Sequence, residues 1–356
     1  MAHALPQLDN SEYTVGWITA LPHETAAAVA MLDKKHASPQ HRREKDHNKY
    51  AFGSVNCESG EHYVVIANLP SGNYGNIPAS TTAAHMLSSF PAIKFGLMVG
   101  IGGGIWSQRH DIRLGDVVVS EPKGSFGGVR LYDFGKATVD GFQCCGSLNE
   151  PPRVLLNAIG ALQSKHEMGR SMTPDILRIT HIKYPDMKEP RTGPGYVHQG
   201  PGNDRLFRSD YRHQSNEKSC HACDEAGEIV RGERPDCDPF IHHGTIASGN
   251  KVIKDAQTQD LLARDCLCFE TEAAGLMNDF PCLVIRGICD YCDSHKNDQW
   301  QRYAAATAAA YAKELLRVID PADVNKTPRA IDGMRHVCTK LTQIHFVHEL
   351  NEGHFL

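Results

Sequence analysis

The strongest constraint on the fold is the alternation of short apolar runs with helical stretches along most of the chain. Two alanine-rich amphipathic stretches, at 21–33 and 299–318, predict helices. Such alternation is typical of α/β proteins, in which helices cover the faces of a mostly parallel or mixed sheet. We therefore predict an α/β fold. The predicted strands are at residues 13–19, 62–68, 95–100, 116–120, 243–248 and 282–289.

The predicted elements divide the chain into one domain and two tails. At 356 residues the chain is long enough for one large domain with additions, or for two domains. We place an α/β domain at 13–320, after an N-terminal tail (1–12) and before a His-rich C-terminal tail (321–356) that could hold a short helix. Residues 183–239 are rich in Gly, Pro, Arg and His and weakly periodic, so we interpret them as a long insertion.

Composition excludes several classes of protein. Hydrophobic residues make up 41% and charged residues 22%, which is ordinary for a globular chain. A net charge of -5 argues against a protein that coats nucleic acid. The N-terminus lacks the pattern of a secretory signal, and no apolar run reaches the ~18–20 residues of a membrane helix. We expect a cytoplasmic protein that binds neither nucleic acid nor membrane, with its twelve cysteines reduced.

Two glycine-rich segments follow predicted strands, at 71–76 (SGNYGN) and 100–104 (GIGGG). We interpret both as loops in which backbone N–H groups could approach a ligand closely. Their spacing does not match the dinucleotide-binding fingerprint, and a tight turn without a ligand is an equally good interpretation.

Acidic residues stand at a strand-to-helix junction and directly after a predicted strand. Glu270 and Glu272 stand two apart at a strand-to-helix junction, where a buried acid could hold a sugar diol through two charge-assisted hydrogen bonds. The alternative is that they complement a helix dipole. Asp290 follows the buried strand at 282–289, and ligands of α/β sheets bind at such strand ends. Asp290 is therefore a candidate general acid if burial favours its protonated form. Asp293 is a second candidate, but a cap is its better interpretation.

The insertion contains two further candidate sites. Cys220 and Cys223 form a single CxxC, with Cys237, His242 and His243 beyond it. Because a second CxxC is missing, a zinc site stays an alternative to reduced thiols in a loop. The arginines of the insertion could form a solvated face or bind the phosphates of a nucleotide; they are Arg191, Arg205, Arg208, Arg212, Arg231 and Arg234.

Six segments together resemble the purine nucleoside and uridine phosphorylase superfamily. Within it they are most similar to fungal relatives often found as the N-terminal domain of signalling ATPases and ankyrin proteins. The resemblance covers nearly all of 13–318 and implies a three-layer α/β/α sandwich around a twisted mixed sheet, and a homo-oligomer. The segments are 16–28 (GWITALPHETAAA), 97–105 (LMVGIGGGI), 114–120 (LGDVVVS), 242–250 (HHGTIASGN), 269–277 (FETEAAGLM) and 284–316.

The resemblance also separates hydrolysis from phosphorolysis. Hexameric phosphorylases of the superfamily hold phosphate with an Arg-Val-Gly-Ser run, where this chain has Met98-Val99-Gly100-Ile101. The first loop instead resembles methylthioadenosine/S-adenosylhomocysteine nucleosidase. This implies hydrolysis of the N-glycosidic bond of purine, chiefly adenine, nucleosides or nucleotides, without cofactor or metal. A phosphorolytic purine nucleoside phosphorylase and a non-catalytic nucleoside-sensing module are the alternatives, and the base and the 5′ substituent stay open.

The same resemblance implies roles for individual residues. Glu24 would orient and deprotonate the attacking water. Glu272 would bind the ribose hydroxyls beside Thr271, where the family usually has methionine. Asp290 would protonate N7 of the leaving purine, and the preceding Cys289 needs no chemical role. The remaining substrate-binding residues that the resemblance implies are Gly102, Asn250, Val252 and Ile253.

Overall fold

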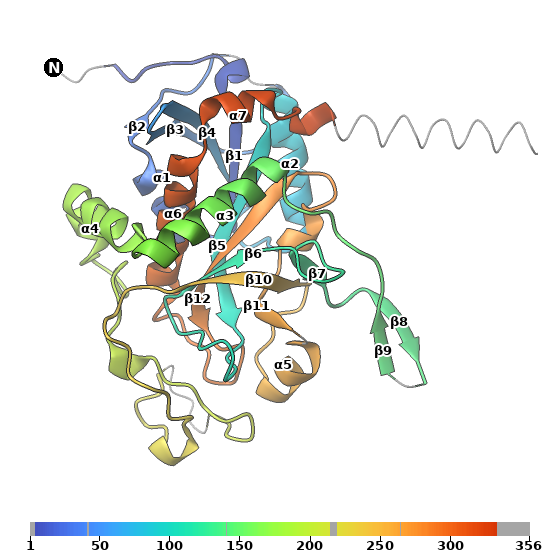
Figure 1. Ribbon diagram of the computed structural model, residues 1–356, viewed down its shortest axis with the longest axis vertical. Helices are drawn as coiled ribbons and strands as arrows, with labels where there is room; N and C mark the ends of the chain where they lie inside the picture. The colour runs from blue at the N-terminus through green and yellow to red at the C-terminus, as the bar shows by residue number, and fades with distance from the viewer. Residues whose placement is uncertain (1–3, 41–42, 140, 214–218, 264, 333–356) are drawn as a thin grey trace, which may run out of the picture.

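The computed structural model describes residues 4–40, 43–139, 141–213, 219–263 and 265–332 (Figure 1). The α-helices are α1 (Pro22–Met31), α2 (Asn76–Ser89), α3 (Arg153–Met168), α4 (Thr173–Lys183), α5 (Ala256–Ala263), α6 (Gln301–Val318) and α7 (Pro321–Lys326). The strands are β1 (Val15–Thr19), β2 (Lys34–Lys35), β3 (Tyr50–Cys57), β4 (Gly60–Asn68), β5 (Phe95–Gly104), β6 (Val117–Ser120), β7 (Val129–Leu131), β8 (Gly135–Thr138), β9 (Gly141–Cys144), β10 (Ile241–Ser248), β11 (Cys266–Glu270) and β12 (Cys282–Asp290). Short 3₁₀ helices are η1 (Asn10–Glu12), η2 (Pro185–Met187), η3 (Pro201–Asn203), η4 (Glu225–Gly227) and η5 (Ala273–Gly275).

The described strands form a ten-stranded mixed sheet and the separate hairpin β8–β9. The sheet has the order β11-β10-β6-β12-β5-β1-β4-β3-β2, with β7 on β10. Strands β1, β5 and β12 run parallel at its centre. Strand β11 also pairs antiparallel with the end of β5, through Cys268↔Gly104 and Phe269↔Gly103. The pairing closes β5, β12, β6, β10 and β11 into a ring, which the sequence analysis did not predict.

Helices cover both faces of the sheet. Every residue of β1 is buried, as expected for a strand covered on both sides. On one face a Cβ at Gly16 would lie 2.8 Å from Met86 Sδ of α2. On the other, Thr19 Oγ1 lies 2.8 Å from Thr25 Oγ1 of α1. The predicted α/β fold, with a mixed sheet between helices, is confirmed.

The glycines at 100–104 lie in strand β5, so their prediction as a loop is wrong. The strand continues because neighbouring side chains occupy the space that side chains at these positions would fill. A Cβ at Gly100 would overlap Arg286 Nη1 and Glu24, and one at Gly103 would overlap Cys292 and Asp290. The glycines are thus needed for close approach to the strand rather than for a turn.

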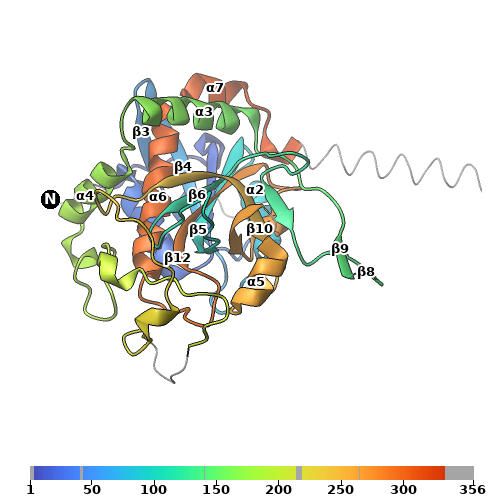
Figure 2. The ribbon, with the colours of Figure 1, turned by 60° about the horizontal axis from the view of Figure 1, so that its bottom comes forward.

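The insertion follows α4 and ends where β10 begins at Ile241. In its described part it contains 3₁₀ turns and an isolated bridge between Phe207 and Glu228, with no longer element. Figure 2 shows this segment, in yellow-green, at the same end of the molecule as α5 and the ends of β5 and β12. The insertion therefore lies beside the strand ends rather than over the helical layers.

Both predicted tails are only partly described. Residues 321–326 form the short helix α7, as the sequence analysis allowed, and 333–356 lie outside the described residues. All cysteines of the described residues are free thiols. None of the helices described here has the length and apolar character needed to cross a membrane.

Candidate functional site

A cavity of about 380 Å³ opens where β1, β5, β11 and β12 end. Its walls come from the loop after β1, the end of β5, the loop before α5 and the segments that follow β11 and β12. The lining residues include Leu21, Glu24, Tyr74, Ile101, Gly102, Lys251, Val252, Ile253, Lys254, Glu270, Thr271, Glu272, Arg286, Cys289, Lys296 and Gln301. The acids expected at 24 and 272 thus face one cavity.

Glu24 is buried in the first turn of α1 and anchored by the backbone. Proline at the first position of α1 favours a helix start there. Glu24 Oε2 accepts hydrogen bonds from the N–H groups of Ala20 (2.7 Å) and Leu21 (2.9 Å), and Oε1 accepts one from Ile101 (2.8 Å). Burial raises the pKa of Glu24, although Arg286 and these donors oppose the shift. A buried carboxyl group with a raised pKa in a cavity is a candidate general base.

Arg286 is the buried cation of this site. Its side chain lies in β12 with 1% of its surface exposed. The guanidinium is paired with Glu270, lies 3.3 Å from Glu272 Oε2 and donates to the carbonyl of Ile101. Burial opposes its charge, but Glu270, Glu272 and Glu24 together raise the pKa of Arg286 overall. The sequence analysis missed it, although an arginine within an apolar strand is rarely buried without a charged partner.

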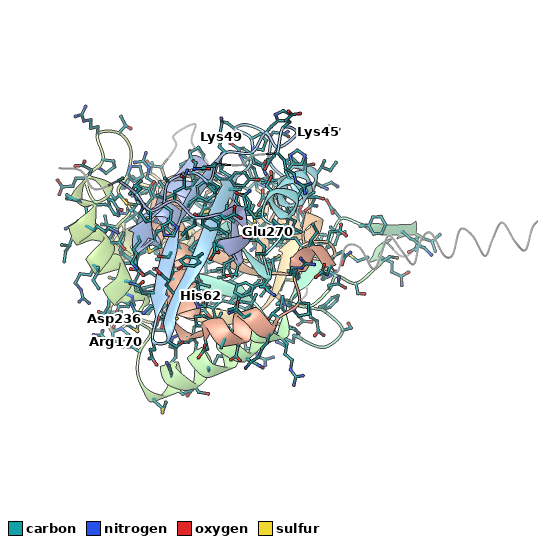
Figure 3. The ribbon with its side chains drawn as sticks, turned by 90° about the horizontal axis from the view of Figure 1, so that it is seen from above. Lys45, Lys49, His62, Arg170, Asp236 and Glu270 are labelled. Carbon is teal, nitrogen blue, oxygen red and sulfur yellow. The ribbon has the colours of Figure 1, made fainter. Side chains whose placement is uncertain are left out.

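The two acids after β11 have different positions. Glu270, labelled in Figure 3, accepts hydrogen bonds from the N–H groups of Glu272 (3.1 Å) and Ala273 (3.0 Å), so it caps η5 as well as pairing with Arg286. Glu272 faces the cavity and accepts a hydrogen bond from the Thr271 hydroxyl. Burial raises the pKa of Glu272, and Arg286 opposes the shift. Glu270 thus caps the turn after β11, whereas Glu272, although it contacts Arg286 and Thr271, faces the cavity in which a ligand could reach it.

Asp290 lies at the end of β12 in an ion pair that the sequence analysis did not predict. Its Oδ2 is 2.7 Å from Lys296 Nζ and accepts a hydrogen bond from the Cys289 thiol at 3.0 Å. Its Oδ1 accepts from the Cys292 N–H. Burial opposes the charge of Lys296, but Asp290 raises the pKa of the ammonium group overall. The sequence analysis did not predict this contact between the Cys289 thiol and the candidate acid.

Asp290 and Asp293, unlike Glu24, do not line the main cavity. Asp290 lines a smaller adjoining cavity, and Lys296 lines both. Asp293 Oδ1 accepts a hydrogen bond from the His295 N–H at 2.9 Å, so Asp293 caps a local turn. This agrees with its interpretation as a cap, and Lys296 is the residue that connects Asp290 with the main cavity.

The remaining residues that the resemblance implied divide into two groups. Gly102, Thr271, Val252 and Ile253 line the cavity; Val252 is 60% exposed and Ile253 is buried. Asn250 does not line it. Its N–H donates to Asp133 and its side-chain oxygen accepts from the Asn76 N–H at 3.3 Å, so Asn250 links two loops near the cavity.

Three insertion arginines are paired inside the protein, so both interpretations made from the sequence are wrong for them, while Arg191, Arg208 and Arg212 are exposed as a solvated face requires. Arg205 pairs with Glu228, Arg231 with Asp204 at 3.1 Å, and Arg234 with Asp116 at 2.7 Å. They are neither a solvated face nor free for phosphate. The exposed cations of the cavity are instead two lysines that the sequence analysis did not single out, Lys251 and Lys254.

The related sequences are of two kinds, an NLR-like protein and an ATP nucleosidase, and no family model matches the chain. The chain is 43% identical over 318 residues to a nucleotide-binding leucine-rich repeat (NLR)-like protein of Hyaloscypha variabilis, over 89% of this chain and 30% of that protein. It is 24% identical over 310 residues to the ATP nucleosidase Cap17 of Escherichia coli, over 84% of this chain and 50% of that protein. The chain thus spans half or less of these relatives.

Solved structures of nucleosidases share the fold. The 5′-methylthioadenosine/S-adenosylhomocysteine nucleosidase of Neisseria meningitidis, in complex with methylthio-immucillin-A, matches 85% of this chain and 98% of its own, with a TM-score of 0.51 and 14% identity. The futalosine hydrolase of Helicobacter pylori matches 86% of this chain and 97% of its own, with a TM-score of 0.51 and 14% identity. The chain therefore has the nucleoside-phosphorylase-like fold that the resemblance implied.

Replacing Arg286, the buried cation of the site, should lower the free energy of unfolding because its buried acids lose their partner. In Arg286→Met, carboxylates of the site would remain buried without their partner. We expect the free energy of unfolding at pH 7.5 to fall by about 3–5 kcal/mol. The loss should shrink as the pH falls towards the ordinary glutamate pKa of 4.5, because protonation removes the unpaired charges.

Urea unfolding at pH 7.5 and pH 5 would measure both effects. Arg208→Met is the matched control, because Arg208 is exposed and its pair with Asp210 lies at the surface. It should cost less than about 1 kcal/mol at either pH. A loss in Arg286→Met that is equally small at both pH values would contradict the role assigned to this arginine.

Proposed function

We propose that the protein hydrolyses the N-glycosidic bond of purine nucleosides or nucleotides, releasing the free base and ribose or ribose phosphate. The fold shared with nucleosidases supports this. One observation in the cavity carries the proposal: Glu24 is anchored by three backbone N–H groups, and burial raises the pKa of its carboxyl group. An oriented carboxylate of this kind is suited to deprotonate water beside a bound sugar.

The other acids suit the electrostatics of glycosidic bond cleavage. In our proposal Glu272 binds the ribose hydroxyls by charge-assisted hydrogen bonds, and Glu24 activates the water that attacks the anomeric carbon. Positive charge develops on the sugar as the bond breaks, as in an oxocarbenium ion. Carboxylates fixed at the cavity wall would stabilise that charge without further reorganisation.

The charges of the cavity favour water over phosphate as the attacking group. Glu24, Glu270 and Glu272 would repel an incoming phosphate dianion. The guanidinium of Arg286 is already engaged by two of these acids. A closed phosphate site needs an available cation or several donors. The exposed lysines Lys251 and Lys254 also line the cavity, but the contacts of Glu24 in the described residues are backbone N–H groups and Arg286, with neither lysine among them. Hydrolysis is therefore our proposal.

The leaving purine needs a proton on N7 to depart as a neutral base. We assign this role to Asp290: it would take up a proton before cleavage and pass it to N7, and Lys296, whose Nζ lies 2.7 Å from Oδ2, would stabilise the carboxylate that is left. The pair lies where β12 ends, and Lys296 reaches the main cavity. Lys296 holds the orientation of the acid, and the Cys289 thiol provides a second contact to the same oxygen.

The substrate that we favour is an adenine nucleotide, ATP in particular. The Escherichia coli relative is an ATP nucleosidase. Lys251 and Lys254 are exposed at the cavity, and no ion-pair partner is found for either ammonium group in the described part of the chain. Lysine is a common phosphate-binding residue because it presents a compact positive charge. These two lysines would therefore bind the phosphate chain.

The location, oligomeric state and partners of the enzyme are proposed from composition and resemblance. We propose a cytoplasmic homo-oligomer whose partner is the small-molecule substrate, with neither nucleic acid nor membrane involved. The chemistry at the glycosidic bond would need no cofactor or metal, since water, a base and an acid are sufficient for hydrolysis.

The first test identifies the second substrate. In phosphate-free buffer we expect free adenine from adenosine or ATP, together with ribose or ribose triphosphate, measured by chromatography. Glu24→Gln should abolish this release because it removes the base. If release requires phosphate and yields ribose 1-phosphate, the enzyme is a phosphorylase. Binding of nucleotide without any product would indicate a sensing module instead.

The second test separates the acid from the base. Asp290→Asn keeps the shape but cannot transfer a proton, so turnover of purine substrates should fall by about 10²–10⁴-fold. A nitrophenyl riboside, whose leaving group needs no proton, should lose much less. Glu24→Gln is the matched variant and should impair both substrates. Equal losses for both substrates in Asp290→Asn would show that Asp290 has a structural role only.

The third test concerns the 5′ phosphates. Replacing both Lys251 and Lys254 with alanine should lower kcat/KM for ATP by about 10–100-fold, because charge-assisted contacts are lost. Cleavage of adenosine should change by less than about threefold. Arg208→Ala is the control for the insertion arginines and should affect neither substrate. Equal losses for ATP and adenosine in the double variant would contradict the phosphate-binding role.

A further inference from the structure

The insertion brings three metal-ligating side chains together beside the smaller cavity, which Cys220 lines together with Asp290. One ligand atom each of His213, Cys220 and Cys223 lies within 4.8 Å of the other two. All three residues are partly buried, and both cysteines are free thiols. The sequence alone offered a single CxxC with irregular partners, and the fold adds a histidine from before it in the chain.

The CxxC turn is held in shape by its surroundings. The Cys223 N–H donates to the carbonyl of Cys220 at 3.0 Å. Arg205 donates to the carbonyls of both cysteines, at 2.9 Å for Cys223, and Arg205 is itself paired with Glu228. Both thiols are thus presented from a turn whose carbonyl groups are fixed, which lowers the cost of ordering them around an ion.

Two thiolates and an imidazole are ligands that Zn²⁺ prefers. In a tetrahedral zinc site with Zn–S of about 2.3 Å and Zn–N of about 2.0 Å, the ligand atoms stand roughly 3.5–3.8 Å apart. The three atoms here are already within 4.8 Å of one another. Small rotations of the side chains are enough to close them around an ion.

His295 has the features of a fourth ligand. Its side chain is buried, and no hydrogen-bond partner for Nε2 is found among the described residues. Its Nδ1 lies 3.2 Å from Asp293 Oδ2, and a proton on Nδ1 leaves a lone pair on Nε2. Zinc-bound histidines usually donate their other N–H to a carboxylate in this way. The His295 ring lies 5.4 Å from the His213 ring, and the Cys220 thiol donates to the His295 carbonyl.

We propose that His213, Cys220 and Cys223 bind one Zn²⁺, with Nε2 of His295 completing the tetrahedron. His295 lies outside the 4.8 Å group, so zinc binding draws it towards the other three ligands. The ion fastens the insertion to the segment after β12. Metal binding is independent of the proposed reaction. Any effect of the bound metal on activity rests on the proposed function, because the ligand His295 is next to Lys296, the ion-pair partner of Asp290.

The test measures metal directly in the full chain without substrate. Elemental analysis of the protein, purified under reducing conditions and reconstituted with Zn²⁺, should give about one zinc per chain. Replacement by Co²⁺ should give thiolate-to-cobalt charge-transfer bands and the visible bands of a tetrahedral site. Cys220→Ser with Cys223→Ser should lose both the metal and these bands. Cys237→Ser is the matched control, because it removes an exposed thiol of the same insertion and should keep both.

Two further variants test the assignment of His295. His295→Ala should still bind cobalt but lose the four-coordinate tetrahedral bands, and Asp293→Asn should weaken zinc affinity by about 10–100-fold. If the cysteine variants fold poorly, chelator titration of the unaltered protein gives the stoichiometry and affinity instead. Absence of bound metal after reconstitution, or a Cys220–Cys223 disulfide in place of it, would overturn the proposal. If the unaltered protein binds a full equivalent of zinc but does not cleave nucleotides, the result would count against the proposed function and not against the zinc site.

Discussion

The burial of Arg286 among carboxylates is the interaction on which the site depends. A guanidinium with 1% exposure is tolerable only when it is paired, and Glu270 and Glu272 provide the pairing from the segment that ends β11. That segment can reach β12 because β11 pairs back onto the end of β5. The closure of the sheet and the charge balance of the site therefore support each other: without the ring the arginine would lose Glu270 and Glu272, and without the arginine these two acids would be buried unpaired.

The same crowding explains the sequence of β5. Arg286 and Glu24 approach the strand so closely at Gly100 that a side chain there would displace them, and Cys292 and Asp290 do so at Gly103. The cluster looks like a ligand-binding loop in the sequence because glycine is needed in both situations. Here the glycines bring the acids to the strand, and the ligand would meet the acids. Several carboxylates around one engaged cation are suited to stabilise a cationic transition state and poorly suited to hold an attacking phosphate beside them, whereas the phosphate chain of the proposed nucleotide would lie at Lys251 and Lys254.

Local pattern predicted the central strands and the helices α1 and α6 but missed helices α2 to α5 and strand β3, and long-range pairing decided the site. The apolar runs at 13–19, 95–100 and 282–289 were enough to place the central strands, because a strand that is buried on both faces has a continuous apolar run. The closure of β11 on β5 could not be predicted, since it depends on contacts between segments far apart in sequence. The roles of Glu24 and Glu272 were predicted from the resemblance to the superfamily, which assigns them to individual positions of the sequence. Arg286 and Lys296 were missed, because an isolated charge shows its role only when its partner is known.

The insertion contacts the segment that carries the proposed acid, Asp290. Tyr291, directly after Asp290, donates a hydrogen bond to Asp204 and accepts one from Arg231, and both partners lie in the insertion. The Trp300 indole donates to the carbonyl of Asn203 from the other end of the same loop. A loop that carries a general acid must hold its geometry within a fraction of an ångström for proton transfer. The polar composition of 183–239 therefore agrees with a segment held by paired charges: Arg231 and Asp204 hold the Tyr291 hydroxyl after β12, while Tyr196 and Leu206 pack in the hydrophobic core.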